Sequence, residues 1–401
     1  MLDIVQQYIN TLVHFNWQNL FTQDFSLVIF LTWMIVPFYF FVTLVAGLIK
    51  QSLRHIGDRD DLLIVQIPTI GNTTVNHIVW RLRQYDIKNV LYWLIIEEWD
   101  DENKYKGFDK VIKVPSSFTT RCKYKARALE YARRVRLEMI NRGELPREYK
   151  VLQCDDDSVP SKELMIEAKN TPYDVLIATI KPNYSKGSIL ARIADYERPF
   201  ACSCTCSFFT SIKKPVWAHG EALVFNHKVD RLISLDIPCV MASEDMIFTH
   251  LASYHNIKMT NTPNTVSIIP PLRFSDLVRQ RKRWIWGHIN AIRFVLPLGS
   301  KIRLIYANMI GLVGYGLATV FIPLVTFNIV QLTPEQHLLT TISLGIWFLT
   351  RFIAVSKVSG VKHGLIATAL SYIIVTINFI VHVRGLLSKP PQRFEVIEKT
   401  I

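Results

Sequence analysis

Long apolar stretches lie near both ends of the chain, and about 250 residues of mixed pattern separate them. The first stretch, Leu27–Ile49, has no charged residue and is long enough to cross a hydrocarbon core of about 30 Å as a helix. Toward the C-terminus follow three more, at Leu304–Leu332, Leu338–Ser356 and Gly364–Val383. The pattern predicts transmembrane helix 1 within residues 27–50 and transmembrane helices 2 to 4 within residues 301–386.

Three further segments are predicted to lie at the membrane surface or outside the bilayer. In residues 1–26, apolar positions recur at helical spacing, which predicts an amphipathic helix lying on the membrane. Residues 271–300 are also expected to form interfacial helices, and residues 387–401 a polar tail. Arg351 is the one charge within the third C-terminal stretch, so it must reach the interface or find a partner.

The distribution of Lys and Arg predicts the orientation in the membrane. Residues 1–26 contain neither, whereas Lys50 and Arg54 follow the first stretch and Lys301 and Arg303 precede the second. The large middle segment is therefore expected on the cytoplasmic side of a multi-pass protein. With four spans the C-terminal tail falls outside, although this end carries Arg384, Lys389, Arg393 and Lys399. A re-entrant segment would remove that conflict.

Between the apolar stretches, short β-branched runs alternate with segments of helical pattern. The runs are LLIVQI at 62–67, VLYWLII at 90–96, VIKV at 111–114, VLQC at 151–154 and VLIATI at 175–180. Thr73–Tyr85 and Arg121–Arg142 have the clearest helical pattern. This alternation predicts one α/β domain over residues 51–270, built on a mostly parallel sheet.

Composition narrows the class of protein. The chain has 401 residues, half of them hydrophobic, and a formal net charge of +13. Its basic residues are scattered or flank the apolar stretches, so anionic lipid and an anionic substrate account for them without nucleic acid. Six cysteines include no Cys-x-x-Cys pair. Cys202, Cys204 and Cys206 would share one face of a strand, and we interpret them as small buried residues rather than a zinc site.

An acidic triplet follows the apolar run at 151–154. On an extended chain, Asp155 and Asp157 project to one side and Asp156 to the other. Two carboxylates on one side suit Mg²⁺ or Mn²⁺ bridging to a diphosphate. The alternative is a turn ahead of a helix, capped by Ser158 or Ser161 with Pro160 in its first turn.

Two more clusters have both a chemical and a structural interpretation. Glu244 and Asp245 are acidic residues in the first turn of a predicted helix, where their charges would interact favourably with the helix dipole. Alternatively, Asp245 is a general base. Gln280, Arg283 and Trp284 share one face of a predicted helix, whereas Arg281 and Lys282 point elsewhere. That helix is either interfacial, with tryptophan at headgroup depth, or one wall of a site.

The order of these clusters resembles the membrane-embedded family-2 glycosyltransferases, the group that contains cellulose and hyaluronan synthases. The resemblance extends from about residue 60 onward and rests on an Asp-x-Asp after a strand, a Glu-Asp pair and a Gln-x-x-Arg-Trp before the spans. Within that group, KARALEY at 125–131 and RQRKRW at 279–284 are similar to segments of the egghead-type β-mannosyltransferases. Glu97 stands where many relatives have Asp.

The resemblance implies a GT-A (Rossmann-like) α/β domain in the cytosol, combined with an α-helical transmembrane region. It implies that Asp155 and Asp157 bind Mg²⁺ or Mn²⁺, and that Asp245, with Glu244 beside it, accepts the proton of the acceptor hydroxyl. The implied donor-binding residues are Pro68, Thr69, Asn72, Glu97, Lys125, Arg127, Asp155, Gln280 and Arg283. On the acceptor side it places Trp284, Gly220 and His219.

The function that follows is an inverting transfer of a sugar, most simply mannose from GDP-mannose, to a glycolipid or lipid-linked glycan. One alternative is a processive polysaccharide synthase that uses a UDP-sugar and extrudes a polymer. Another is an inactive membrane scaffold that retains the fold. The expected partners are the nucleotide sugar, the lipid-linked acceptor and membrane lipids, with no nucleic acid and no obligate protein partner.

Overall fold

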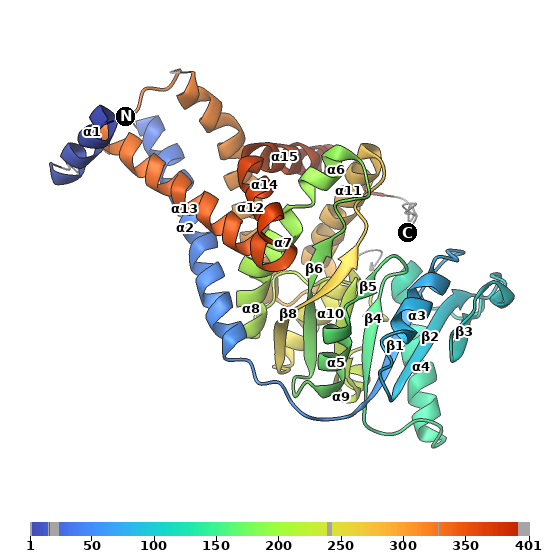
Figure 1. Cartoon of the computed structure of the whole chain (residues 1–401). Helices are drawn as coiled ribbons and strands as arrows, with labels where there is room; N and C mark the ends of the chain where they lie inside the picture. Colours follow the sequence, from blue (N-terminus) through green and yellow to red (C-terminus); the bar gives the residue numbers. More distant parts are fainter. Residues whose placement is uncertain (1, 15, 17–23, 239–242, 328, 392–401) are drawn as a thin grey trace.

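A computed structural model of the chain describes residues 2–14, 16, 24–238, 243–327 and 329–391. A mixed sheet with helices on both faces forms one part of the molecule, and long apolar helices form the other (Figure 1). The sheet part spans the segment in which the sequence predicts an α/β domain.

Eight strands form one sheet in the order β3-β2-β1-β4-β7-β6-β8-β5. Their bounds are β1 Leu62–Pro68, β2 Val90–Glu97, β3 Lys110–Val114, β4 Tyr149–Cys154, β5 Val159–Pro160, β6 Val175–Pro182, β7 Ala222–Asn226 and β8 Met259–Ile268. The five runs predicted as strands are β1, β2, β3, β4 and β6. The sheet is mostly parallel, as predicted, and the antiparallel strands β7 and β5 make it mixed.

Helices of the sheet part follow or precede these strands. They are α3 Val75–Arg83, α4 Tyr124–Asn141, α5 Lys162–Asn170, α6 Ile189–Ala194, α7 Glu197–Ala201, α8 Ser207–Ser211, α9 His227–Leu232, α10 Glu244–Tyr254 and α11 Phe274–Asn290. Short 3₁₀ and π-helical turns lie at Glu102–Lys104, Cys202–Cys206 and Ala291–Val295. Ser161 caps α5, accepting the Leu164 N–H at 3.2 Å. Pro160 belongs to β5 and not to the first turn of that helix.

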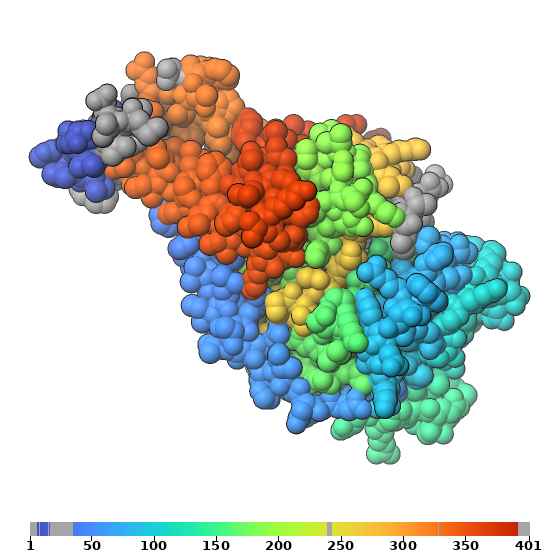
Figure 2. Space-filling model, viewed as in Figure 1, coloured from blue at the N-terminus to red at the C-terminus, as the bar shows by residue number. Residues whose placement is uncertain are grey.

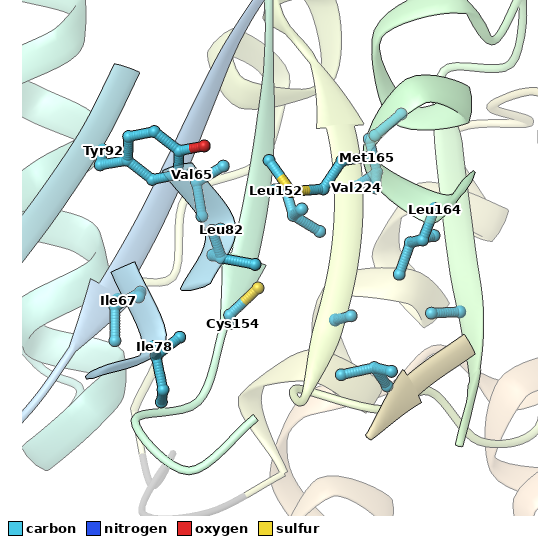
Figure 3. Packing of buried hydrophobic residues seen from close by; sticks show 14 of the residues in the cluster. Val65, Ile67, Ile78, Leu82, Tyr92, Leu152, Cys154, Leu164, Met165 and Val224 are labelled. Carbon is cyan, nitrogen blue, oxygen red and sulfur yellow. The ribbon is translucent and has the colours of Figure 1, made fainter. Parts of the chain in front are cut away.

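Alternate residues of the central strands fill two cores, one on each face of the sheet. Leu63, Val65 and Ile67 of β1 pack on one face against α3 and α5 (Figure 3). Ile64 points to the opposite face and packs with residues of α4 and α10. The period of two that identified β1 in the sequence therefore also distributes its side chains between the layers.

A buried ion pair joins α4 to α9 beneath the sheet. Arg136 binds Asp230 at 2.7 Å, and Tyr149 of β4 donates to the same carboxylate at 2.7 Å. Arg136 also donates to Gln66 of β1. Because both charges are almost fully buried, this network fixes the helices to the strands at the cost of desolvating them.

The long helices are apolar on their outer surfaces. They are α2 Asp24–Ser52, α12 Leu298–Thr326 and α13 Pro334–Ser359, and all three are long and apolar enough to cross a membrane. Side chains such as Val42, Met309 and Phe348 are exposed on them. In Figure 2, α2 and α13 lie along one side of the molecule, next to the sheet part. An apolar surface of this extent is characteristic of contact with lipid.

The fourth predicted span is broken into two helices. Val361–Ala369 (α14) and Ser371–Leu387 (α15) meet at an angle of 69°, which is the form of a broken span or a re-entrant loop. The first helix of the chain, α1 Leu2–Val13, lies within the predicted interfacial segment. The rest of that segment at 17–23 and the tail at 392–401 lie outside the described residues.

Arg351 within α13 finds the partner that its position requires. Its guanidinium binds Glu197 at the start of α7 at 3.0 Å and lies over the rings of Phe200 and Trp347. Tyr315 of α12 donates to the same carboxylate. The contact ties two long helices to the sheet part.

The interpretation of the alternating cysteines as a strand is wrong. Residues 197–211 form α7, a π-helical turn at Cys202–Cys206 and α8, packed between the sheet and the long helices. A helical backbone turns successive side chains by about 100° rather than 180°. Cys202 therefore packs against the sheet core, and Cys204 packs among the long helices.

The buried pair predicts a test of the fold. Asp230→Asn leaves the Arg136 guanidinium buried without its counter-charge, so we expect a loss of about 3–5 kcal/mol of stability, measured by thermal unfolding in detergent micelles. Glu138→Gln is the matched control, because Glu138 lies on the same helix in an exposed pair with Arg142 that contributes at most about 1 kcal/mol. Equal stability of the two variants would contradict this role for the network.

Candidate active site

A cavity of about 350 Å³ opens at the carboxyl end of the parallel strands and extends to the long helices. β1, β2 and β4 end here at Pro68, Glu97 and Cys154. The antiparallel β7 starts at the same edge, where Ala222 is paired with Cys154. The residues just before β7 therefore lie beside those just after β4.

The cavity collects most of the residues that the sequence assigns to a site. Thirteen of the fifteen line it: Pro68, Thr69, Glu97, Lys125, Asp155, Asp157, His219, Gly220, Glu244, Asp245, Gln280, Arg283 and Trp284. Asn72 and Arg127 do not. Asn72 donates to the backbone of Asp156 at 3.2 Å. Arg127 binds Glu97 at 2.8 Å and two backbone carbonyls, so it supports the wall from behind.

Carboxyl groups outnumber cations in the wall. The eight acidic residues are Glu97, Asp155, Asp156, Asp157, Glu197, Glu221, Glu244 and Asp245, and the four cations are Lys125, Arg198, Arg281 and Arg283. A negative cavity in a chain of net charge +13 is unexpected from composition alone. It fits a bound cation, and carboxylate oxygens are the ligands that Mg²⁺ and Mn²⁺ prefer.

Lys125 holds the centre of this acidic wall together. Its ammonium binds Asp155 at 2.5 Å and Glu244 at 2.8 Å, so it joins α4 to the end of β4 and the start of α10. Burial lowers the pKa of this amine, but the neighbouring carboxylates outweigh burial and raise it well above its ordinary value. Lys125 is therefore a fixed positive charge.

The members of the acidic triplet have different partners. Asp156 accepts a hydrogen bond from Thr69 at the end of β1 at 2.7 Å, whereas Asp155 is bound by Lys125. Burial and the adjacent Asp157 raise the pKa of Asp156 to about 6. Burial also raises the pKa of Asp155 above its ordinary value. These shifts are expected where several carboxylates share a buried site.

Asp245 has the chemistry of a general base that works near neutral pH. Burial, followed by repulsion from Glu244, raises the pKa of Asp245 to about 7. Lys125 opposes the shift. The result is a carboxylate that can accept a proton at physiological pH.

Backbone strain surrounds the Lys125–Glu244 contact. Tyr124 and Ser243, the residues immediately before them, have φ values of 56° and 64°. This left-handed region costs a non-glycine residue about 1 kcal/mol or more. Ser243 also makes no side-chain cap for α10.

Gly220 lets the loop before β7 approach both charged centres. A Cβ at this position would lie 2.9 Å from the Lys125 ammonium and 3.3 Å from Asp245. Lys125 cannot move away easily because two carboxylates hold it. Glycine at position 220 is thus required for packing of the site.

Helix α11 contributes more of its surface to the cavity than its sequence pattern indicates. Gln280, Arg283 and Trp284 line the cavity as predicted, and Gln280 has a buried Oε1 without a hydrogen-bond partner. The expectation that Arg281 points elsewhere is wrong. It is buried, binds Asp195 at 2.9 Å and lies over the Trp284 ring at 4.2 Å, because α6 and α15 enclose α11 from the other side.

The cavity also has residues that the sequence analysis did not single out. Arg198 forms an ion pair with Glu221 and lies over Trp284 at 5.2 Å. At the end nearest the long helices, the wall is formed by His288, Asn308, Asn378 and His382. The available indication was the presence of Asn and His inside apolar stretches, where polar residues usually face a cavity or the bundle interior.

The raised pKa of Asp245 predicts a pH-dependent stability. Between pH 3.8 and about 7 the folded chain holds a proton that the unfolded chain has released, so stability falls as pH rises through this window. Asp245→Asn, which carries no charge, should therefore be more stable than the original chain at pH 8 by about 1–3 kcal/mol and equal to it near pH 4. Thermal unfolding with a chelator present measures both, and a less stable variant at pH 8 would contradict the prediction.

Comparisons with known proteins identify the family. The model of the glycosyl transferase family group 2 matches residues 151–381. Among solved structures, the chain is similar to the mannosyltransferase PcManGT from Pyrobaculum calidifontis in complex with GDP-Man and Mn²⁺. The two share 14% identity and a TM-score of 0.43, over 85% of this chain and 99% of that one. No curated protein matches the chain.

The region that the family model matches runs from β4 through the acidic triplet, Glu244–Asp245 and α11 into the long helices. The mixed α/β sheet agrees with the GT-A-like fold expected of such enzymes. Since the model covers more than half of the sequence, this chain belongs to the glycosyl transferase family group 2.

Proposed function

We propose that the protein is an inverting membrane glycosyltransferase that transfers mannose from GDP-mannose to a glycolipid or lipid-linked glycan. The observation that carries the proposal is that one cavity contains the carboxylates of Asp155, Asp157 and Asp245 and has a far end formed by α12 and α15. The choice of GDP-mannose rests on the resemblance of residues 125–131 and 279–284 to egghead-type enzymes.

In this proposal the donor binds at the strand ends. Pro68, Thr69 and Glu97 line the part of the cavity next to β1 and β2, where the nucleoside would lie. Asp155 and Asp157 would hold Mg²⁺ or Mn²⁺. When bound, this cation neutralises charge on the diphosphate as it leaves. Arg283 lines the same wall and supplies a fixed positive charge for the diphosphate.

The proposed reaction is one direct displacement. Asp245 accepts the proton of the acceptor hydroxyl, whose oxygen forms a bond to the anomeric carbon while the bond from that carbon to the diphosphate oxygen breaks. The nucleoside diphosphate leaves with the bonding electrons. Glu244 is held by Lys125, which leaves Asp245 as the base, and a single displacement inverts the anomeric configuration.

The acceptor is proposed to enter from the membrane end of the cavity. Trp284, with the two guanidinium groups over its ring, lines the same cavity as the carboxylates and as Asn308 and Asn378. Polar side chains there are suited to the hydroxyl groups of a sugar, and the surrounding helices to its lipid. The distribution of Lys and Arg supports a cytoplasmic position for the sheet part.

Turnover of sugar nucleotides by the full chain in detergent tests the function. The protein is incubated with GDP- and UDP-sugars, Mg²⁺ or Mn²⁺ and a membrane lipid extract, and release of the nucleoside diphosphate is measured. We expect turnover with GDP-mannose, addition of a single sugar and a β-linkage in the product by NMR. Absence of turnover with every donor would refute the proposal, and long polymeric products would indicate a processive synthase.

Asp245→Asn tests the assignment of the base. The amide cannot accept the proton, so kcat should fall by about 10²–10⁴-fold while donor binding, measured as thermal stabilisation by the nucleotide, is retained. In the original chain, kcat/KM should rise with pH up to about 7, where Asp245 becomes ionised. Glu138→Gln on the surface of α4 is the control and should leave both quantities unchanged.

Substitutions within the acidic triplet distinguish the residues proposed to bind the metal ion from Asp156. Asp155→Asn and Asp157→Asn should each remove most of the Mn²⁺-dependent stabilisation and activity, because each deletes a proposed ligand. Asp156→Asn should retain Mn²⁺ binding, since its carboxylate is held by Thr69. Equal loss of Mn²⁺ binding in all three variants would show that this division is wrong.

A further inference from the structure

Two cysteines and a histidine converge beside the cavity. His219 Nε2 lies 3.2 Å from Cys202 Sγ and 3.5 Å from Cys206 Sγ. All three atoms lie within 4.8 Å of one another. His219 also lines the cavity, but the proposed binding of Mg²⁺ or Mn²⁺ by Asp155 and Asp157 uses none of these three residues.

The separations are close to those in a tetrahedral metal site. Zinc binds thiolate sulfur at about 2.3 Å and imidazole nitrogen at about 2.0 Å, which places neighbouring ligand atoms about 3.5–3.8 Å apart. The two nitrogen–sulfur distances are within a few tenths of an ångström of that range. Small side-chain rotations would therefore suffice to admit an ion.

The backbone departs from α-helical geometry at this place. In the turn Cys202–Cys206, the N–H of Ser207 reaches back to the carbonyl of Cys202, so the turn holds one extra residue. π-helical turns are rare in proteins, and those that do occur often lie at functional sites. Here the turn presents Cys202 and Cys206 together to His219, while Cys204 faces the core of the long helices.

Ordinary packing gives a poorer explanation of the cluster. Thiols are weak hydrogen-bond donors and acceptors. The two thiols therefore replace poorly the hydrogen bonds to water that the imidazole nitrogen loses on burial. Both cysteines are fully buried. A soft cation would satisfy the nitrogen and both sulfurs at once, and thiolate ligands select zinc over Mg²⁺ or Mn²⁺.

We propose that Cys202, Cys206 and His219 bind one zinc ion, with the fourth coordination position open to water. The two thiols release their protons when the ion binds. The site is distinct from the carboxylate site, where hard oxygen ligands favour Mg²⁺ or Mn²⁺.

The ion would fasten the loop before β7 to the helical segment 197–211. His219 immediately precedes Gly220, whose backbone lies against Lys125 and Asp245. Cys202 belongs to the core under the sheet. Zinc would thus fix the loop that lies against Lys125 and Asp245. Its removal should lower both thermal stability and turnover without acting on the nucleotide cation.

The metal content of the full chain tests the site. Protein purified in detergent without metal-affinity resin should contain about one zinc ion per chain, measured by inductively coupled plasma mass spectrometry. Cys202→Ser, Cys206→Ser and His219→Ala should each lower this several-fold. Cys204→Ser is the matched control in the same turn and should retain zinc, and so should Asp157→Asn, which disables only the proposed nucleotide cation site.

Cobalt gives a measurement that does not depend on any variant folding. Replacement of zinc by Co²⁺ in the original chain should produce the visible absorption of tetrahedral cobalt and a thiolate-to-cobalt charge-transfer band. Absence of both zinc and cobalt binding, or a Cys202–Cys206 disulfide in freshly purified protein, would overturn the proposal. Equal loss of zinc in Cys204→Ser would overturn it as well. Zinc retained in Asp157→Asn, together with no turnover of any sugar nucleotide by the original chain, would leave this site established and the proposed function refuted.

Discussion

One buried ammonium group holds the acidic centre of the protein in place. Lys125 contacts Asp155 and Glu244, from two different elements, and thereby offsets the repulsion among the carboxylates at the strand ends. Removing such a charge would leave its partners buried without compensation, which is far more costly than never burying them. The left-handed residues Tyr124 and Ser243 on either side indicate that the backbone accepts strain to bring this contact about.

A second ion pair determines how the sheet part meets the long helices. Glu197 receives both Arg351 and Tyr315, and it also lines the cavity. The charge that is costly within α13 is therefore neutralised by a residue of the site. Because α11 packs against α15 on one side and contributes Trp284 to the cavity on the other, the site is completed only when both parts of the molecule are present.

The sequence predicted the features that depend on local pattern. Strands β1, β2 and β4 are long β-branched runs, and their carboxyl ends gather the acidic triplet and Glu97 as a parallel arrangement requires. It did not predict what depends on tertiary contacts. β7 runs antiparallel, the cysteines lie on a helix, and Arg281 faces the cavity because helices from distant segments enclose α11. Likewise Arg127, matched by its motif, is occupied by Glu97 and backbone carbonyls. Pattern could identify residue types suited to the chemistry but not their partners.

The composite wall of the cavity has an evolutionary consequence. Its strand-end part comes from residues 68–157 together with residues 197–246, and its membrane end comes from residues 280–382. These stretches are separate in the sequence and meet only in the folded chain. Substitutions in Asn308, Asn378 or His382 could therefore alter which molecule is admitted from the bilayer while the acidic centre stays intact. A lineage with this architecture can diversify at one end of the cavity without losing the chemistry at the other.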